Sequence, residues 1–191
     1  MTTYHHGNLP EQLLTEAAAM AAEVGPARIT LRELARRAGV SHSAPVHHFK
    51  TLRGLLTALA ISGFESLTGA LQAGDQAGEQ DIYAMGARYV EWALAHPGHY
   101  AVMWQPALLD EVDSSLRASK DSAWEALSTT VAESSSARDA ETAQADAYAA
   151  FSLVHGLADL WLNGALPTPA EPGVLIAEVT RRLQFGPRAG A

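Results

Sequence analysis

Hydrophobic positions along the chain recur with the three- and four-residue spacing of helices, and the alternation typical of strands is missing. The pattern predicts four helices within residues 8–72. Short breaks rich in proline, glycine or serine separate five further helices, predicted near residues 81–95, 97–104, 108–134, 139–164 and 170–185. The predicted fold class is therefore all-α, with a three-helix head joined to a larger helical body through the fourth helix.

The head carries a dense set of helix start and stop signals. Thr30 is predicted to cap the second helix, with Glu33 three residues later completing a capping box. Gly39 is predicted to end this helix in the left-handed conformation of a Schellman motif. Ser41 and Thr51 are the predicted N-caps of a short third helix and a long fourth helix. A capped helix, a tight "AGVS" turn and a second short helix together predict a helix-turn-helix.

Composition and charge narrow the classes of protein. The 191 residues are 48% hydrophobic, enough for a substantial core, and the absence of cysteine excludes disulfides and thiolate metal sites. The formal net charge is −8. Residues 1–55 carry six basic and four acidic side chains, hence +2, while the remainder carries seven basic and seventeen acidic side chains, hence −10. A weakly basic head on an acidic body favours one orientation towards a polyanion.

Export and membrane insertion are not expected. The N-terminus lacks the basic segment and apolar core of an export signal. The longest uncharged run, residues 92–109, contains two prolines and two histidines, which argues against a membrane span. A cytoplasmic location without membrane contact is expected.

The stretch "YHHGNLPEQLLTEAAAMAAEVG", followed by "ITLRELARRAGVSHSAPVHHFKTLRGLLTAL", resembles the TetR family of bacterial one-component repressors. The likeness combines helix lengths, capping, the "AGVS" turn and the closing "HF" before a long helix. It implies a helix-turn-helix DNA-binding domain in residues 1–53 and a helical effector-binding and dimerisation domain in residues 54–191. It also implies a homodimer that binds a palindromic double-stranded DNA operator and is released by a small apolar or aromatic effector of unknown identity.

The resemblance also implies which residues contact DNA. Arg32, in the first turn of the second helix, matches a position where family members read a base, and the start of the third helix faces base edges. Thr30, His48, Lys50 and Thr51 match phosphate contacts, supported by amides at helix N-termini. The expected DNA-binding residues are Thr30, Arg32, Ser41, His42, Ser43, Ala44, His47, His48, Lys50 and Thr51.

Two positions depart from the family pattern. Val46 stands where the family usually has tyrosine, and Leu52 stands where it usually has lysine at the start of the fourth helix. Each difference removes a phosphate donor, with Arg53 and Lys50 as the candidate replacements. Weaker non-specific DNA binding is therefore expected.

The body offers a candidate effector pocket. Its fifth helix is apolar on two faces, so that one face is available to a cavity. Aromatic side chains with a few polar groups are typical of an apolar ligand site, although each of them alone is more often a core residue. The predicted ligand-binding residues are Phe64, Met85, Tyr89, Trp92, Tyr100, Met103, Trp104, Trp124 and His155.

The stretch "AYAAFSLVHGLADLWLNG" resembles the WHG-type C-terminal domain of one TetR subgroup. The tryptophan of that motif is Phe151 here, while His155 and Gly156 match it. By analogy, the eighth and ninth helices would form a four-helix interface with their copies in a partner chain. The expected interface residues are Ala149, Ser152, Gly156, Ala158, Leu175 and Val179.

The sequence evidence for a catalytic site or a metal site is weaker. Ser152, His155 and Asp159 share one helical face, but mid-helix amides are already bonded and a "GxSxG" elbow is missing, so no catalytic residue is predicted. His96 and His99 lack an evident third ligand, so neither a metal nor a cofactor is predicted. The alternative function is a helical dimeric module that binds a small molecule or a protein without sequence-specific DNA binding.

Overall fold

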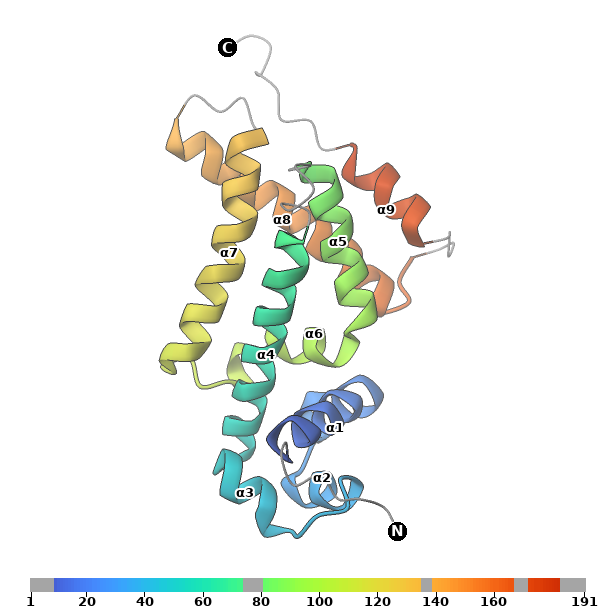
Figure 1. Ribbon diagram of the computed structural model, residues 1–191. Helices are drawn as coiled ribbons and strands as arrows, with labels where there is room; N and C mark the ends of the chain where they lie inside the picture. The colour runs from blue at the N-terminus through green and yellow to red at the C-terminus, as the bar shows by residue number, and fades with distance from the viewer. Residues whose placement is uncertain (1–8, 74–80, 135–138, 167–171, 183–191) are drawn as a thin grey trace. The chain divides into compact units, whose positions relative to one another are not determined.

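The computed structural model describes residues 9–73, 81–134, 139–166 and 172–182, and their regular structure is entirely helical (Figure 1). This confirms the predicted all-α class. Nine α-helices and two 3₁₀ turns lie in these ranges: α1 (Leu9–Val24), η1 (Pro26–Arg28), α2 (Leu31–Arg37), α3 (Ser43–Phe49), α4 (Leu52–Gln72), α5 (Ile82–Ala95), α6 (Pro97–Met103), η3 (Pro106–Leu108), α7 (Ser114–Ser134), α8 (Ala140–Leu162) and α9 (Pro172–Thr180).

The start of α7 differs from the sequence prediction, which placed a helix over residues 108–134. Asp113 ends the preceding turn, and its Oδ1 accepts hydrogen bonds from the backbone N–H groups of Ser115 at 2.8 Å and Leu116 at 2.9 Å. The backbone N–H of Asp110 donates instead to Oγ1 of Thr57 on α4, at 2.9 Å. The helix therefore starts after an aspartate cap that the apolar pattern did not reveal.

The described chain forms two compact units. Unit 1 comprises residues up to Phe64 together with residues 96–119, and unit 2 comprises residues 65–95 together with those from Lys120 onwards. The helix-turn-helix head thus belongs to the same unit as α6 and η3. Compactness alone does not define a functional domain, so the predicted division into residues 1–53 and 54–191 stays a prediction.

In unit 1, α1 packs directly against α6 (Figure 1). Gly98 allows this approach, because a Cβ at its position would lie 1.9 Å from the backbone oxygen of Ala18. Gly63 has the same role between α4 and α6, since a Cβ there would lie 2.5 Å from the sulfur of Met103. Two glycines therefore set the close packing beneath the head.

In unit 2, α5 packs against both α8 and α9. The buried side chains along α5 include Met85, Tyr89, Val90 and Trp92, so the helix is covered on more than one face, as its sequence predicted. The indole N–H of Trp92 donates to Oγ of Ser66 at 3.0 Å, which satisfies the polar atom of this buried ring.

Among the described helices, α4 alone is long and apolar enough to cross a membrane by length and composition. Half of its apolar stretch is buried inside the chain, as in core helices of water-soluble proteins. Buried Leu55, Leu59 and Leu67 account for much of this apolar character through core packing.

Candidate functional site

The turn between α2 and α3 is fixed by local hydrogen bonds. Oγ1 of Thr30 accepts a hydrogen bond from the backbone N–H of Glu33 at 3.2 Å, as expected for an N-cap. At the other end of α2, Gly39 has φ +67°. The backbone N–H of Val40 donates to the carbonyl of Ala35 at 3.0 Å, and the backbone N–H of Gly39 donates to the carbonyl of Arg36 at 3.3 Å. These bonds are the Schellman pair that the sequence predicted.

The start of α3 corrects one expected detail. The predicted side-chain cap at Ser41 is not formed; Oγ of Ser41 lies 3.1 Å from Oγ of Ser43, and His42 is the cap residue, without a side-chain cap bond. His42 already has helical dihedral angles, and the N–H of Ala44 donates to the carbonyl of Ser41 at 3.0 Å. A backbone turn therefore takes the place of the serine cap.

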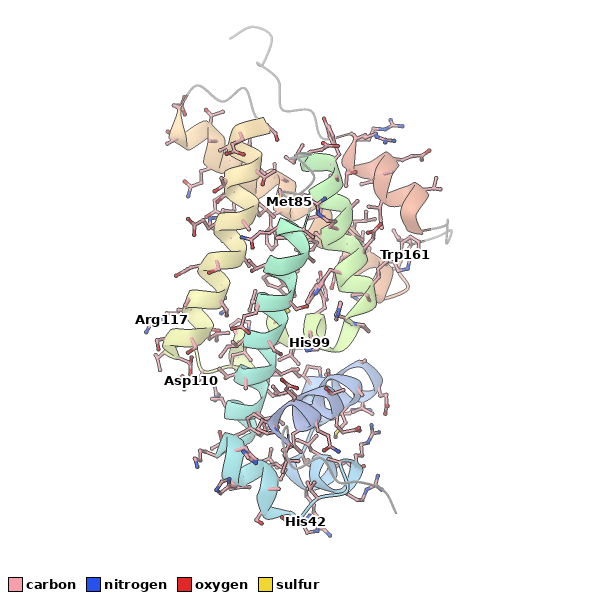
Figure 2. The ribbon with its side chains drawn as sticks, in the orientation of Figure 1. His42, Met85, His99, Asp110, Arg117 and Trp161 are labelled. Carbon is pink, nitrogen blue, oxygen red and sulfur yellow. The ribbon has the colours of Figure 1, made fainter. Side chains whose placement is uncertain are left out.

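The expected DNA-binding residues form an accessible surface on unit 1. Ala44 is half-buried, and the other nine expected residues are exposed. His42 lies at the turn that leads into α3 (Figure 2). Pro45 is the buried residue that anchors α3. The exposed side of this short helix consequently consists of polar side chains together with Val46, which is 46% exposed.

Two arginines of the head are neutralised, whereas Arg32 is not. Arg36 donates to the carboxylate of Glu33 through Nε at 2.8 Å and Nη2 at 2.6 Å. These bonds lower the pKa of Glu33 to about 2. Arg37 binds Glu16 at 3.3 Å and Glu23 at 2.5 Å. Exposed Arg32 has no hydrogen bond or ion pair within the described ranges, so its guanidinium is available to a ligand.

The two candidate replacements for missing phosphate donors differ in the structure. Arg53 donates through Nη1 to the carbonyl of Leu109 and through Nη2 to that of Ala107 at 3.3 Å, so it ties the start of α4 to η3. Lys50 is exposed, has φ +65°, and its Nζ donates to the carbonyl of His47 at 2.9 Å. Of the two, Lys50 directly follows α3, the second helix of the helix-turn-helix.

The helix that follows Lys50 has the expected cap. Oγ1 of Thr51 accepts a hydrogen bond from the backbone N–H of Gly54 at 3.0 Å. This confirms Thr51 as the N-cap of α4. Since the hydroxyl oxygen is the acceptor, its hydrogen is left to donate outwards.

The predicted ligand-binding residues divide between the two units. Unit 1 contains Phe64, Tyr100, Met103 and Trp104, and the ring of Trp104 lies 5.3 Å from that of Phe64 and 6.3 Å from that of Tyr100. Beside them, burial lowers the pKa of His99, with a further contribution from His96. This cluster is an aromatic core of unit 1.

Unit 2 contains the other five predicted residues, Met85, Tyr89, Trp92, Trp124 and His155. The hydroxyl of Tyr89 lies 2.9 Å from Nδ1 of His155, and the ring of Phe151 lies 5.2 Å from the His155 ring. Burial lowers the pKa of His155, while the charge of Asp159 opposes this effect.

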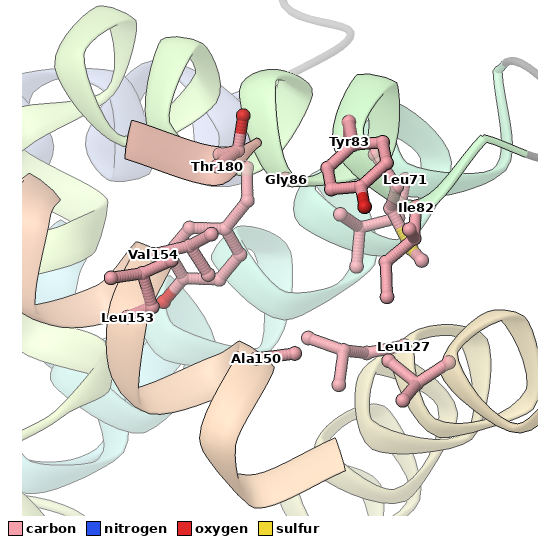
Figure 3. Close-up of a pocket in the computed structure, with 12 residues that line it drawn as sticks. Leu71, Ile82, Tyr83, Gly86, Leu127, Ala150, Leu153, Val154 and Thr180 are labelled. Atoms are coloured by element: carbon pink, nitrogen blue, oxygen red, sulfur yellow. The ribbon is translucent and has the colours of Figure 1, made fainter. Parts of the chain in front are cut away.

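An apolar pocket lies within unit 2, between α4, α5, α7, α8 and α9 (Figure 3). The space inside it that a water-sized molecule can enter measures about 30 Å³, and a value of about 410 Å³ is reached only when the solvent-open side is included. The lining residues are Leu71, Ile82, Tyr83, Met85, Gly86, Tyr89, Leu127, Val131, Ala150, Leu153, Val154 and Thr180.

Sequence reasoning identified two of these twelve residues, Met85 and Tyr89. The others are mainly aliphatic, and their sequence pattern is that of any core residue. Gly86, in the middle of a helix, was the one local signal that pointed to an unusual position.

The expected dimer residues lie on α8 and α9. Ala149 and Ser152 are exposed, and Gly156, Leu175 and Val179 are half-buried. Ala158 is fully buried within its own chain, so its side chain does not reach the surface that a partner would contact. Large apolar residues that the sequence analysis did not name are exposed on the same two helices: Tyr148 (54%), Leu160 (46%) and Val174 (60%).

Catalytic and metal chemistry gain no support from the described residues. Ser152 and Asp159 are exposed on α8, and His155 is bonded to Tyr89. Within the described ranges, no three histidine, aspartate or glutamate side chains are grouped so that they could hold a metal ion.

A helix-turn-helix with an exposed second helix, in a helical chain that also has an apolar pocket, is the arrangement expected of a DNA-binding transcriptional regulator. Residues 13–59 match the family model described as bacterial regulatory proteins, tetR family, and residues 82–183 match the tetracyclin repressor-like C-terminal domain. The chain belongs to the TetR family, whose regulators are non-enzymatic. The alternative of a module without DNA binding is therefore not supported.

Solved structures share the whole fold. The chain is similar to a protein with unknown function from Rhodococcus sp. RHA1, with 32% identity, a TM-score of 0.77, and coverage of 96% of this chain and 97% of that chain. The TetR family transcriptional regulator PfmR from Thermus thermophilus is 18% identical, with a TM-score of 0.72 and coverage of 93% and 99%. A TetR-family transcriptional regulator from Bordetella parapertussis 12822 is 17% identical, with a TM-score of 0.71 and coverage of 95% and 97%. The curated proteins include no match.

Proposed function

We propose that the chain is a cytoplasmic, ligand-responsive repressor that binds a palindromic operator as a homodimer and is released by a small apolar effector. The observation that carries this proposal is the exposed helix-turn-helix surface, in which Arg32 is unpaired while the neighbouring Arg36 and Arg37 are held by carboxylates. An unpaired arginine beside a recognition helix is suited to bidentate contact with guanine.

The surface divides into residues that read bases and residues that hold the backbone. Arg32 and the exposed residues at the start of α3, His42 and Ser43, are assigned to bases. The Thr30 and Thr51 hydroxyl oxygens accept hydrogen bonds from their own helices, so their hydrogens stay available to donate to phosphates. The full proposed set is that expected from the sequence: Thr30, Arg32, Ser41, His42, Ser43, Ala44, His47, His48, Lys50 and Thr51.

Exposed apolar side chains support dimerisation through α8 and α9. Tyr148 and Leu160 on α8 and Val174 on α9 expose about half of their area or more in the single chain. Large apolar side chains that stay exposed in a single chain are candidates for contact with a partner. We include Ala149, Ser152, Gly156, Leu175 and Val179 in this interface.

The effector belongs to the body, where Met85 and Tyr89 of the predicted ligand residues line the apolar pocket. A small molecule can release the operator only if it binds more tightly to the chain that is free of DNA than to the DNA-bound chain. Effector binding and operator binding are therefore expected to weaken each other by the same factor.

The test is selection of duplexes from a random pool by the full-length protein, with light scattering of the resulting complex. A palindrome with half-sites about one helical turn apart, bound by two chains, is the expected result. Failure to enrich any sequence at low salt, or a monomer at micromolar concentration, would contradict the proposal.

A further inference from the structure

Val46 is an apolar side chain on the polar surface of the head. It is 46% exposed, although it lies in the middle of α3 and directly follows Pro45, the buried residue of that helix. Across α2 and α3, both of which the structure describes in full, Val46 is the one large apolar residue that is exposed. Its backbone carbonyl accepts a hydrogen bond from the N–H of Lys50 at 2.9 Å, so the isopropyl group is the part of Val46 that a ligand can contact.

Val46 shares a face of α3 with the residues assigned to bases. His42 has φ −58° and ψ −23°, so the helical spiral extends back to it, at the turn that leads into α3 (Figure 2). Because successive residues of a helix are about 100° apart, Val46 is about 40° from His42 and about 60° from Ser43, and it lies between them. Pro45, about 100° away, is on the buried side. A helix that presents exposed His42 and Ser43 to bases therefore presents Val46 as well.

The rise of the helix places Val46 close to the base pair that Ser43 faces. A helix rises about 1.5 Å per residue, so Val46 lies about 4.5 Å further along the axis than Ser43. Neighbouring base pairs of a duplex are about 3.4 Å apart. For a helix that lies along the major groove, the base pair that faces Val46 is thus one or two steps from the one that faces Ser43.

The chemistry of the major groove offers one partner for an isopropyl group. The C5-methyl group of thymine is the apolar group of the base edges, and the other groups there are hydrogen-bond donors and acceptors. An isopropyl group beside a donor or an acceptor displaces water without replacing its hydrogen bond, which costs free energy. Beside a methyl group it removes apolar surface of both partners from water, which stabilises the complex.

We propose that Val46 is a specificity-determining residue that selects thymine in each half-site of the operator through contact with the C5-methyl group. The inference rests on the proposed function, because it requires that α3 lies in the major groove of an operator. It adds to the expected DNA-binding residues a position at which the sequence analysis expected only the loss of a phosphate donor. The departure from the family pattern at Val46 thus exchanges a backbone contact for a base contact.

Uracil is the probe for this contact, because it differs from thymine by the C5-methyl group alone. The full-length protein first selects duplexes from a random pool. Each thymine of the selected operator is then replaced by uracil, one position at a time, and affinity is measured by fluorescence anisotropy. Replacement at the thymine that faces Val46 is expected to weaken binding of the wild type about fourfold, the effect of one buried methyl-sized group.

Two valine variants identify that thymine. Val46→Ala removes both Cγ methyl groups and is expected to bind the thymine and uracil duplexes equally well at that position. Alanine is the best helix former and the site is exposed, so the variant should stay folded, which circular dichroism checks. Val24→Ala is the matched control, because Val24 is 40% exposed at the end of α1, outside the helix-turn-helix. It should keep the fourfold preference for thymine.

The outcomes separate this inference from the proposed function. If the wild type selects an operator but Val46→Ala keeps the same preference for thymine over uracil at every position, the inference is wrong and the proposed function stands. If Val46→Ala weakens operator and random duplexes by the same factor, Val46 contacts the sugar–phosphate backbone, and the inference is again wrong. If the wild type enriches no sequence, the proposed function and the inference fail together.

Discussion

The head and the pocket are built by different kinds of interaction. In the head, the helix ends are set by bonds between residues close in sequence, such as the caps at Thr30 and Thr51. In the pocket, five helices contribute residues as distant as Leu71 and Thr180, and none of them is marked by a neighbour in sequence. The comparison shows that a nucleic-acid surface can be encoded locally, whereas a cavity arises only from tertiary packing.

The two regions also present opposite chemistry. The head has an unpaired guanidinium and exposed threonine residues, while two of the hydroxyls in the pocket wall, those of Thr180 and Tyr89, are hydrogen-bonded within the protein. We therefore expect hydrogen bonding to discriminate ligands mainly at the head, and size and polarity to discriminate them mainly in the pocket. Changes that damage one region are expected to leave the ligand preference of the other intact.

The largest expected effect is on the support of the head. Gly98→Val is expected to lower the free energy of unfolding by about 3 kcal/mol or more, because the new side chain collides with the backbone oxygen of Ala18. Urea unfolding followed by circular dichroism measures the change. Operator binding should fall with it, since α1 and α6 belong to the same unit as the recognition helix.

Gly69→Ala is the matched control for this prediction. Gly69 lies in α4, where an added Cβ would have no atom within 4 Å, so alanine should raise the free energy of unfolding by about 0.5–1 kcal/mol through helix propensity. A similar destabilisation by both changes would show that the close approach of α1 and α6 is not what constrains Gly98.

Much of the head could be predicted from sequence because its signals are short-range. Thr30, Gly39 and Thr51 were each assigned from a few neighbouring residues, and the structure has the bonds that these assignments require. Ser41 failed as a cap because a backbone turn at His42 competes with it. Local rules therefore place helix ends, but they do not decide between two local alternatives.

The pocket could not be predicted in the same way. The sequence prediction relied mainly on aromatic residues. In the structure, however, the ring of Trp104 packs against that of Phe64, and the indole N–H of Trp92 donates to Oγ of Ser66. The aliphatic wall has no distinctive sequence pattern, because a leucine that lines a cavity and a leucine in a filled core obey the same periodicity. Gly86 allows the close packing of α5 against α8 and α9, because a Cβ there would lie 3.1 Å from Cγ2 of Thr180 and 3.3 Å from Cγ1 of Val154.

The second prediction sharpens the difference between base and backbone contacts within the head. Arg32→Ala is expected to cost about 1–3 kcal/mol in binding free energy on the selected operator and to relax preference at one base pair. Lys50→Ala is expected to weaken all sequences alike and to reduce the salt slope by about one unit. Fluorescence anisotropy at several salt concentrations measures both. Equal losses on operator and random duplexes for both variants would refute the separate roles.

The third prediction concerns an arginine that joins parts of unit 1 instead of reaching DNA. Arg53→Ala removes bonds to the carbonyls of Leu109 and Ala107 and is expected to lower the free energy of unfolding by about 1 kcal/mol. The salt slope of DNA binding should stay unchanged, in contrast to Lys50→Ala. A reduced slope with unchanged stability would mean that Arg53 leaves η3 and contacts a phosphate.

The smallest expected effect is a pH dependence that originates in unit 2. Burial lowers the pKa of His155 in the folded chain, and the attraction of Asp159 only partly opposes this. Between the ordinary histidine pKa of about 6.5 and the lowered folded value, the unfolded chain binds more protons. The free energy of unfolding should therefore fall as the pH drops below about 6.5.

His155→Gln cannot titrate at this position, so the free energy of unfolding from its urea curves at pH 7.5, 6.5 and 5.5 should depend less on pH than that of the wild type. His99, whose pKa is also lowered by burial, keeps part of the dependence in both proteins, and the difference between them isolates His155. A steeper dependence in His155→Gln would mean that the attraction of Asp159 outweighs burial, and that the protonated ring stabilises the contact between α5 and α8.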